Sequence, residues 1–410
     1  MLDVRPLVAQ ASLLQQRESR VPPGRGFAPS FGNGAVELGQ VPAGEMICDV
    51  GCGEPKDLSV PVHGQQDSGT AWRGQAEWAA AGLLRVAAGP ILSYCETAMN
   101  KRELLLSLLD DSWKPKRVPA AFFLHFDPAF HRGQAAIDKH LEYFRFTDMD
   151  FVKIQFERPF PRLEINRPGD WSKVPLYDRG FFEAPLKVVD GLVKAAGREA
   201  LVLLTLYSPF MLACQTAGAE TVVRHAQEDP EAFKRGMEVI TEGLLGFVKE
   251  CVRLDLDGFY SSTQGGESGR FSDPKAFTEC VRPFDLAVMA EINTRCRFNI
   301  LHVCDYHLPY SDIAPYASYP GHVVNASLQM TGGEIGAREV SRMFKRPFMG
   351  GLERKGVIAN GTREAIQAVV REALRNAPER FILGADCTVP ADTPWDNIRT
   401  AIQTAHEAAG

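Results

Sequence analysis

A histidine and a cysteine stand two residues apart at the end of an apolar stretch, a spacing suited to metal binding. The stretch "FNILHVCDYH" covers residues 298–307. Because side chains at i and i+2 of a strand point to the same side of a sheet, we expect His302 and Cys304 to project together. A third soft ligand, Cys387, ends the stretch "RFILGADC" at 380–387. Thiolates and neutral imidazole are preferred zinc ligands, and three protein ligands with one open position are typical of a catalytic zinc site.

A second interpretation of the same residues involves no metal. His302 would then be a hydrogen-bonded core histidine, and the two cysteines would be small buried hydrophobic residues. His302 and Cys304 alone favour this interpretation. The position of Cys387 at the end of another predicted strand favours the metal site instead.

The elements that must bring these residues together alternate regularly from Met99 onward. Eight apolar stretches predict strands, at 120–126, 151–157, 200–207, 256–262, 298–304, 322–327, 346–352 and 380–387. Near-continuous apolar runs of this kind are typical of parallel strands covered on both faces. Eight strand and helix units in about 300 residues predict an α/β fold, specifically a (β/α)8 TIM barrel. A doubly wound open sheet is the alternative.

Helix starts between these strands carry a capping residue followed by proline. Three such pairs occur, at Asp229–Pro230, Asp273–Pro274 and Thr393–Pro394. After the first pair, apolar residues recur at helical spacing and predict one buried stripe. Its members are Phe233, Met237, Ile240, Leu244, Phe247 and Cys251.

Polar residues finish most of the predicted strands, which in a barrel meet at the face that carries the active site. Besides the three candidate ligands, the candidates are His125, Tyr207, Gln264, Asp305, Glu353 and Asp386. We expect Asp386 or Asp305 to orient the imidazole of His302. The others are predicted to line the substrate pocket. For each of them, an ordinary polar residue at a strand end is the alternative.

Composition restricts the classes of partner. The chain has 410 residues, a net charge of -6 and no long run of lysine and arginine, which argues against binding to nucleic acid or a membrane surface. No apolar stretch is long enough to span a membrane, and the amino terminus has no secretory signal. The nine cysteines are scattered, which suits a reducing compartment. We therefore expect a cytoplasmic protein with a small-molecule substrate.

Two unequal parts make up the chain. The first 98 residues contain 13 glycines and 8 prolines and show little sustained periodicity. They predict a low-complexity or disordered, poorly structured extension, possibly not native, with Met99 as a natural start. Residues 99–410 form the predicted barrel.

Several blocks of this second part together resemble the uroporphyrinogen decarboxylase family. They are "NKRELLLSLLDD" at 100–111, "LYSPFMLACQTAG" at 206–218, the stretch from "EDPEAF" to "DGFY" at 228–260, "ILHVCD" at 300–305, "MGGLERKGVIANGTREAI" at 349–366 and "FILGADCTVPADTPWDNIRTAI" at 381–402. The resemblance covers roughly the last three quarters of the chain and implies a TIM barrel. The family also contains zinc-dependent methyltransferases that act on corrinoid proteins and thiols.

The resemblance to the methyltransferase branch implies that His302, Cys304 and Cys387 bind Zn2+. The decarboxylase branch carries an Arg-Gln-Ala-Gly-Arg motif after the first strand, whose arginines hold substrate carboxylates. Here that place reads "FLHFDPAFHRGQ", and Arg132 is the only nearby candidate. Asp305 and Glu353 replace the glycine and aspartate that family members usually have. These two departures leave the candidate ligands intact and put the substrate in doubt.

The resemblance therefore predicts transfer of a methyl group between a corrinoid, possibly carried by a partner protein, and a thiol bound at zinc. Asp386 would assist as a neighbour of the ligands. The alternative is a uroporphyrinogen decarboxylase-like lyase acting on a carboxylated tetrapyrrole or another small acid. A third possibility is a barrel that binds a corrinoid or tetrapyrrole without turnover. Zinc content discriminates the first hypothesis from the other two.

Overall fold

Seven parallel strands form a curled sheet in the computed structural model, which describes residues 100–112 and 117–408. The predicted extension at 1–98 lies outside the described residues. The strands are β1 Phe151–Ile154, β2 Leu201–Tyr207, β3 Gly258–Thr263, β4 Ile300–Val303, β5 Val323–Ala326, β8 Phe348–Leu352 and β9 Phe381–Ala385. Their order in the sheet follows the chain, from β1 at one edge to β9 at the other. This is the predicted α/β barrel architecture.

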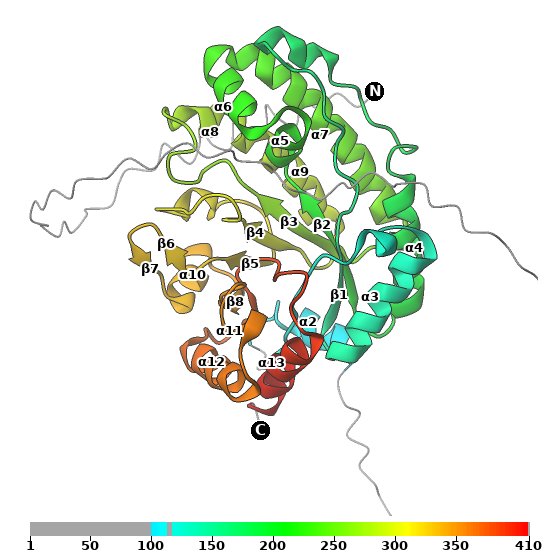
Figure 1. Cartoon of the computed structure of the whole chain (residues 1–410), viewed down its shortest axis with the longest axis vertical. Coiled ribbons are helices and arrows are strands. Elements are labelled where there is room, and N and C mark those ends of the chain that lie inside the picture. Colours follow the sequence, from blue (N-terminus) through cyan, green and yellow to red (C-terminus); the bar gives the residue numbers. More distant parts are fainter. Residues whose placement is uncertain (1–99, 113–116, 409–410) are drawn as a thin grey trace, which may run out of the picture. The chain divides into compact units, whose positions relative to one another are not determined.

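Helices surround the sheet and connect consecutive strands (Figure 1). The α-helices are α2 Lys101–Ser107, α3 Gly133–Thr147, α4 Glu183–Ala196, α5 Pro209–Ala217, α6 Ala219–Glu228, α7 Pro230–Arg253, α8 Lys275–Cys280, α9 Arg282–Arg295, α10 Ala337–Phe344, α11 Val357–Asn360, α12 Arg363–Asn376 and α13 Trp395–Glu407. Short 3-10 helices are η1 Pro128–Phe130, η2 Pro168–Lys173 and η3 Ala314–Tyr316. The strands β6 Gln329–Met330 and β7 Gly333–Glu334 form a separate antiparallel pair.

The predicted first strand, 120–126, is instead an extended segment with a single parallel bridge between Ala120 and Leu383. At the start of this segment the Asp150 carboxylate accepts the amide N–H of Ala120 at 2.7 Å, in place of a backbone carbonyl. The segment nevertheless bonds to both edges of the sheet. The amide of Ala121 donates to the Leu383 carbonyl of β9, and the amide of Asp150, just before β1, donates to the Ala120 carbonyl. It thereby joins β9 to β1, which the open-sheet alternative does not predict.

The remaining strand predictions are confirmed, mostly with shorter ends, although β3 extends one residue beyond its predicted end. Every residue of β1, β3, β4, β5 and β9 is buried. The predicted apolar stripe of α7 is also buried. Asp229 caps α7 as predicted, because its carboxylate accepts the amide N–H of Ala232 at 3.0 Å. The cap predicted at Thr393 is wrong: α13 begins at Trp395, and the buried Thr393 hydroxyl has no hydrogen-bond partner.

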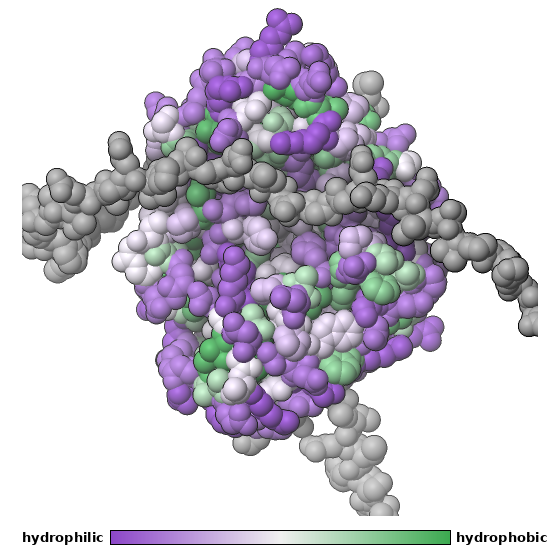
Figure 2. Space-filling model, in the orientation of Figure 1, coloured by the Kyte–Doolittle hydropathy of each residue, from purple (hydrophilic) through white to green (hydrophobic). Residues whose placement is uncertain are grey.

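The surface is predominantly hydrophilic on the face shown in Figure 2, with apolar residues in scattered patches. Among the described residues, the exposed large hydrophobic side chains are Phe146, Leu176 and Tyr306. None of the described helices is long and apolar enough to span a bilayer.

Candidate metal centre

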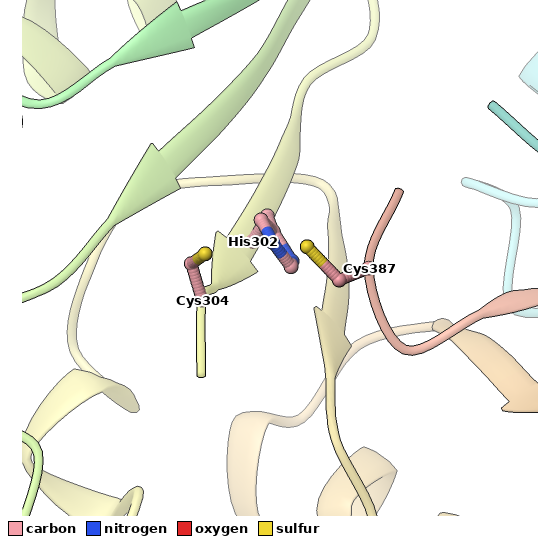
Figure 3. Close-up of side chains that lie close together, drawn as sticks. All are labelled: His302, Cys304 and Cys387. Carbon is pink, nitrogen blue, oxygen red and sulfur yellow. The ribbon is translucent and has the colours of Figure 1, made fainter. Parts of the chain in front are cut away.

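The three candidate ligands come together inside the barrel. One ligand atom each from His302, Cys304 and Cys387 lies within 4.8 Å of the others, and all three residues are buried. Figure 3 shows both sulfur atoms directed toward the imidazole ring. Within the described part of the chain, this is the one group of three or more histidine, cysteine or acidic residues with such geometry. Cys304 and Cys387 lie 83 positions apart in the sequence, so only the predicted barrel fold indicated that they would meet.

Strand pairing fixes the positions of the two segments that carry the ligands. His302 lies in β4 opposite Ser262 of β3 and Asn325 of β5. The amide of Cys304 donates to the Thr263 carbonyl at 3.0 Å and extends the ladder beyond β4, so Cys304 keeps the strand spacing that places it on the same side as His302. Cys387 follows β9 by two residues.

Neither ring nitrogen of His302 has a hydrogen-bond partner of ordinary geometry, although the residue is 1% exposed. The ring packs against Tyr260, with 4.9 Å between the ring centroids. Leaving a buried polar group without a partner costs about 1–3 kcal/mol, so it calls for an explanation. A metal ion bound by one of these nitrogens and the two sulfurs supplies one. The residues present therefore fit zinc, and the two ring nitrogens without a partner of ordinary geometry favour a metal ligand over a hydrogen-bonded core histidine.

The two thiols influence each other. The hydrogen bond with Cys387 holds the pKa of the Cys304 thiol well below its usual value, and the neighbouring His302 ring acts in the same direction. The same hydrogen bond and burial hold the pKa of Cys387 well above its usual value. The two thiols therefore titrate as a coupled pair. The side-chain amide of Gln264 donates to the Cys304 sulfur at 3.4 Å, which places this predicted residue at the centre.

Arg354, which sequence reasoning missed, links the two loops that carry the cysteines. Its guanidinium Nη1 lies 2.8 Å from a carboxylate oxygen of Asp305 and 2.6 Å from one of Asp386. Asp386 also accepts the backbone amides of Arg354 and Cys387. Neither carboxylate contacts the His302 ring, contrary to the expected orienting role. Asp386 instead fixes the backbone at Cys387, and burial raises its pKa.

The neighbouring Glu353 is exposed, and Arg354 rather than Glu353 reaches the centre. In the sequence, Arg354 directly follows Glu353 in the same loop, and this position was the indication that could have identified it. His125 lies at the first segment, where its Nδ1 is 2.8 Å from the Glu157 carboxylate. Tyr207 ends β2, and burial together with the nearby Glu157 and the two cysteines raises its pKa. These placements put His125 and Tyr207 beside Glu157.

A second missed residue is Lys153, in the middle of β1. It is 5% exposed, and its ammonium lies 4.4 Å from the centroid of the Phe123 ring and 4.5 Å from that of Tyr260. Burial lowers the pKa of Lys153 to about 7, and the nearby Cys387, Glu157 and Cys304 oppose this. A lysine inside the apolar run "FVKIQFE" was the signal that could have found it.

The fold and the site together define an α/β-barrel protein with a polar cluster at the carboxyl ends of its strands. Enzymes of this architecture have their active sites at that face. Residues 148–408 match the model of the family described as "Uroporphyrinogen decarboxylase (URO-D)". The chain belongs to the uroporphyrinogen decarboxylase family, as the sequence blocks predicted.

Two further comparisons come from the archaeon Methanosarcina mazei. The chain is 22% identical, over 240 residues, to a methylated-thiol–coenzyme M methyltransferase; the match covers 57% of this chain and 60% of that protein. The chain therefore spans about three fifths of the length of the curated relative it matches. A solved structure entitled "methyltransferase from Methanosarcina mazei" superposes with a TM-score of 0.61 at 12% identity, covering 76% of this chain and 100% of that one. This structural likeness supports the barrel fold.

Proposed function

We propose that this chain is a zinc-dependent methyltransferase that moves a methyl group between a corrinoid and a thiol. One observation carries the proposal: a buried histidine with two unpartnered ring nitrogens faces two cysteine sulfurs in a cluster of ligand atoms within 4.8 Å. Two thiolates, an imidazole and one open position suit a thiol substrate, because zinc has a high affinity for sulfur.

The comparisons support the same proposal. The curated relative is named as a methyltransferase acting on methylated thiols and coenzyme M, and the superposed structure is entitled a methyltransferase. The family name alone would suggest decarboxylation. Both activities would use the same face of the barrel, so the residues at that face decide between them.

Each residue of the centre has a part in the proposed reaction. Zinc, when bound, would hold the substrate sulfur as a thiolate at neutral pH, and a methylated corrinoid would supply the methyl group. His302, Cys304 and Cys387 would hold the metal. Gln264 donates to the Cys304 sulfur and thereby moderates its negative charge. Arg354 holds the loops after β4 and β9 at a fixed separation, because it binds a carboxylate from each.

Decarboxylation of a carboxylated tetrapyrrole is the second candidate, and the family description favours it. Such a substrate needs cationic side chains that are free to bind carboxylates. Arg354 is already paired with Asp305 and Asp386, Arg132 lies at the exposed start of α3, and the buried Lys153 supplies one cation where such a substrate carries several carboxylates. The centre therefore offers better ligands for a metal and a thiol than for a polycarboxylate.

The proposed function also has consequences for the cellular location of the protein and for its partners. Cys304 and Cys387 must stay reduced to bind a metal, which fits the cytoplasm. The corrinoid would be carried by a separate protein, and the thiol would be a small molecule.

Zinc content tests the proposal directly. We expect about one zinc per chain in the wild-type protein and its loss in His302→Ala, Cys304→Ser and Cys387→Ser, with the fold retained by circular dichroism. Cys296→Ser, which changes another buried cysteine at the end of α9, should retain the metal. A wild-type protein that takes up no zinc when it is supplied would contradict the proposal.

Turnover separates the two activities. The zinc-loaded protein should demethylate methylcobalamin in the presence of a thiol such as 2-mercaptoethanesulfonate, with a change in corrinoid absorbance and the appearance of the methyl thioether. The three ligand variants should lose this activity together. Release of carbon dioxide from uroporphyrinogen without methyl transfer would favour the second candidate.

A further inference from the structure

The ammonium of Lys153 is buried inside the barrel without a carboxylate partner among the described residues. Its single hydrogen bond goes to the side-chain amide oxygen of Gln155, at 2.7 Å. That oxygen also accepts the Thr205 hydroxyl at 3.0 Å, so it is a neutral and shared acceptor. A buried lysine is normally paired with an anion, because removing an unpaired charge from water costs several kcal/mol. This cost is comparable to the free energy of unfolding of a whole domain.

Aromatic rings connect this ammonium to the candidate metal centre. Lys153 contacts the Phe123 and Tyr260 rings, whose centroids lie 5.9 Å apart. Tyr260 in turn packs against the His302 ring. The Tyr260 hydroxyl is held by Asn325 at 2.6 Å, so this ring has a fixed position between the lysine and the histidine. The charge of Lys153 lies within electrostatic reach of the centre, because Cys387 and Cys304 both act on its pKa in the buried site.

The other cation near the centre is already committed. Arg354 binds both Asp305 and Asp386, so these three side chains together carry a net charge of -1. Glu157, the nearest carboxylate that acts on Lys153, is bound by His125 at 2.8 Å. Among the described residues near the centre, Lys153 is thus the cationic group without an anionic partner, and an anion entering the barrel would favour its charged form against the effect of burial.

The charge of the proposed centre shows which anion this would be. Zn2+ with two thiolates and a neutral imidazole has no net charge, and a substrate thiolate at the open position adds one negative charge in a buried site. We propose that Lys153 is the counter-ion of this incoming thiolate and makes the centre selective for anionic over neutral ligands. This inference rests on the proposed function. Lys153 is a charge-compensating residue, and the metal ligands remain His302, Cys304 and Cys387.

The matched pair of variants is Lys153→Met and Lys139→Met. Methionine keeps the length of the lysine stem and removes the charge, and it is suited to the aromatic surroundings. Lys139 is also placed over two aromatic rings, Phe130 and Trp395, but it lies on α3 and pairs with Glu142. It controls for the general effect of losing a lysine beside aromatic rings. Lys153→Gln, which can still bond to Gln155, serves as a second neutral variant if Lys153→Met fails to fold.

Cobalt(II) substitution provides a readout besides activity, because thiolate binding to cobalt gives a charge-transfer band in the near ultraviolet. Each protein is loaded with Co2+ and titrated with 2-mercaptoethanol, which binds as an anion, and separately with imidazole, which binds as a neutral ligand. We expect Lys153→Met to bind Co2+ stoichiometrically and imidazole as the wild type does. Its dissociation constant for 2-mercaptoethanol should rise at least about tenfold, while Lys139→Met should match the wild type.

The outcomes distinguish this inference from the proposed function. Unchanged thiol affinity in Lys153→Met and Lys153→Gln, or an equal loss of affinity for thiol and imidazole, would overturn the role of Lys153 while leaving the metal centre intact. A wild-type protein that binds no Co2+, or binds it without taking a thiolate, would overturn the proposed function and this inference with it.

Discussion

The two ends of the barrel treat buried charge in opposite ways. At the amino ends of the strands, the Asp257 carboxylate is bound by Arg102, Arg297 and the backbone amide of Val202. Asp150, just before β1, is likewise bound by an arginine, a histidine and a backbone amide. These carboxylates have all the partners they need, and they tie distant parts of the chain together.

Toward the carboxyl ends, several buried polar groups lack partners, although Asp386 and Glu267 are bound. Both ring nitrogens of His302, the Nε of Arg354 and one carboxylate oxygen of Asp285 have none among the described residues. The ammonium of Lys153 has a single neutral acceptor. The difference teaches that the amino end is built for stability, whereas the carboxyl end retains groups whose partners would come with a ligand.

The largest effect on stability should come from the amino end. Asp257→Ala would leave Arg102 and the Val202 amide without their acceptor, and we expect it to lower the free energy of unfolding by about 3–5 kcal/mol. Chemical denaturation measures this, and zinc content of the remaining folded protein should be unchanged. A loss below about 1 kcal/mol would break the comparison, because the network would then be no more than a surface ion pair.

Zinc should stabilise the folded protein through the carboxyl end of the barrel. At about one hundred times its dissociation constant, zinc is expected to raise the free energy of unfolding by about 2.7 kcal/mol, because it binds the folded state preferentially. A chelator should reverse the change. The same increment should appear in Asp257→Ala and disappear in Cys387→Ser, since the two ends act independently. Stabilisation of Cys387→Ser by zinc would show that the metal binds elsewhere.

The pH dependence of stability tests one of the buried polar groups toward the carboxyl end, the carboxylate of Asp285. Burial raises its pKa to about 7, against the hydrogen bonds that it accepts from Thr263, Tyr319 and Ser208. Between about pH 4 and pH 7 the folded state therefore holds a proton that the unfolded state has lost, and the stabilisation from this group falls as the pH rises through that window. Asparagine carries no such proton, so the difference in free energy of unfolding between Asp285→Asn and the wild type should increase, in favour of the variant, by about 1 kcal/mol or more from pH 5 to pH 8. Denaturation at the two pH values checks this, and an unchanged difference would mean that Asp285 ionises normally.

His302→Leu should have the smallest effect on the metal-free fold. The ring loses no hydrogen bond, and leucine retains apolar packing against Tyr260, so we expect the free energy of unfolding to change by less than about 1 kcal/mol. Zinc binding should nevertheless be lost. A destabilisation similar to that of Asp257→Ala would show that His302 is a structural residue, and the contrast between the two ends would fail.

Local sequence was a reliable guide where the pattern and the environment agree. The apolar runs became seven buried strands, and the spacing of His302 and Cys304 placed both on one side of β4, as strand geometry requires. The segment 120–126 has the same apolar pattern, yet it forms a single bridge, and the amide of Ala120 donates to the side chain of Asp150, which lies 30 positions away. No property of the segment itself reveals that competitor.

The same limit applied to the candidate site. Gln264 was chosen because it follows a strand, and its amide reaches Cys304. Glu353 was chosen at a loop where Arg354 reaches the centre. Side-chain direction after a strand depends on the turn that follows, which the strand period no longer controls. Lys153 lies within a strand and could have been found by asking what a lysine does in a buried apolar run.

The amino-acid sequence by itself determined the order and type of most elements, the family, and the three candidate ligands, because periodicity and ligand chemistry are local properties. Only the tertiary structure decided which charges are satisfied. It joined Arg354 to carboxylates of two loops, left the nitrogens of His302 without partners, and placed the ammonium of Lys153 over the Phe123 and Tyr260 rings. Hydrogen-bond satisfaction and charge compensation depend on which distant groups meet after the barrel closes, and that meeting is a property of the folded chain.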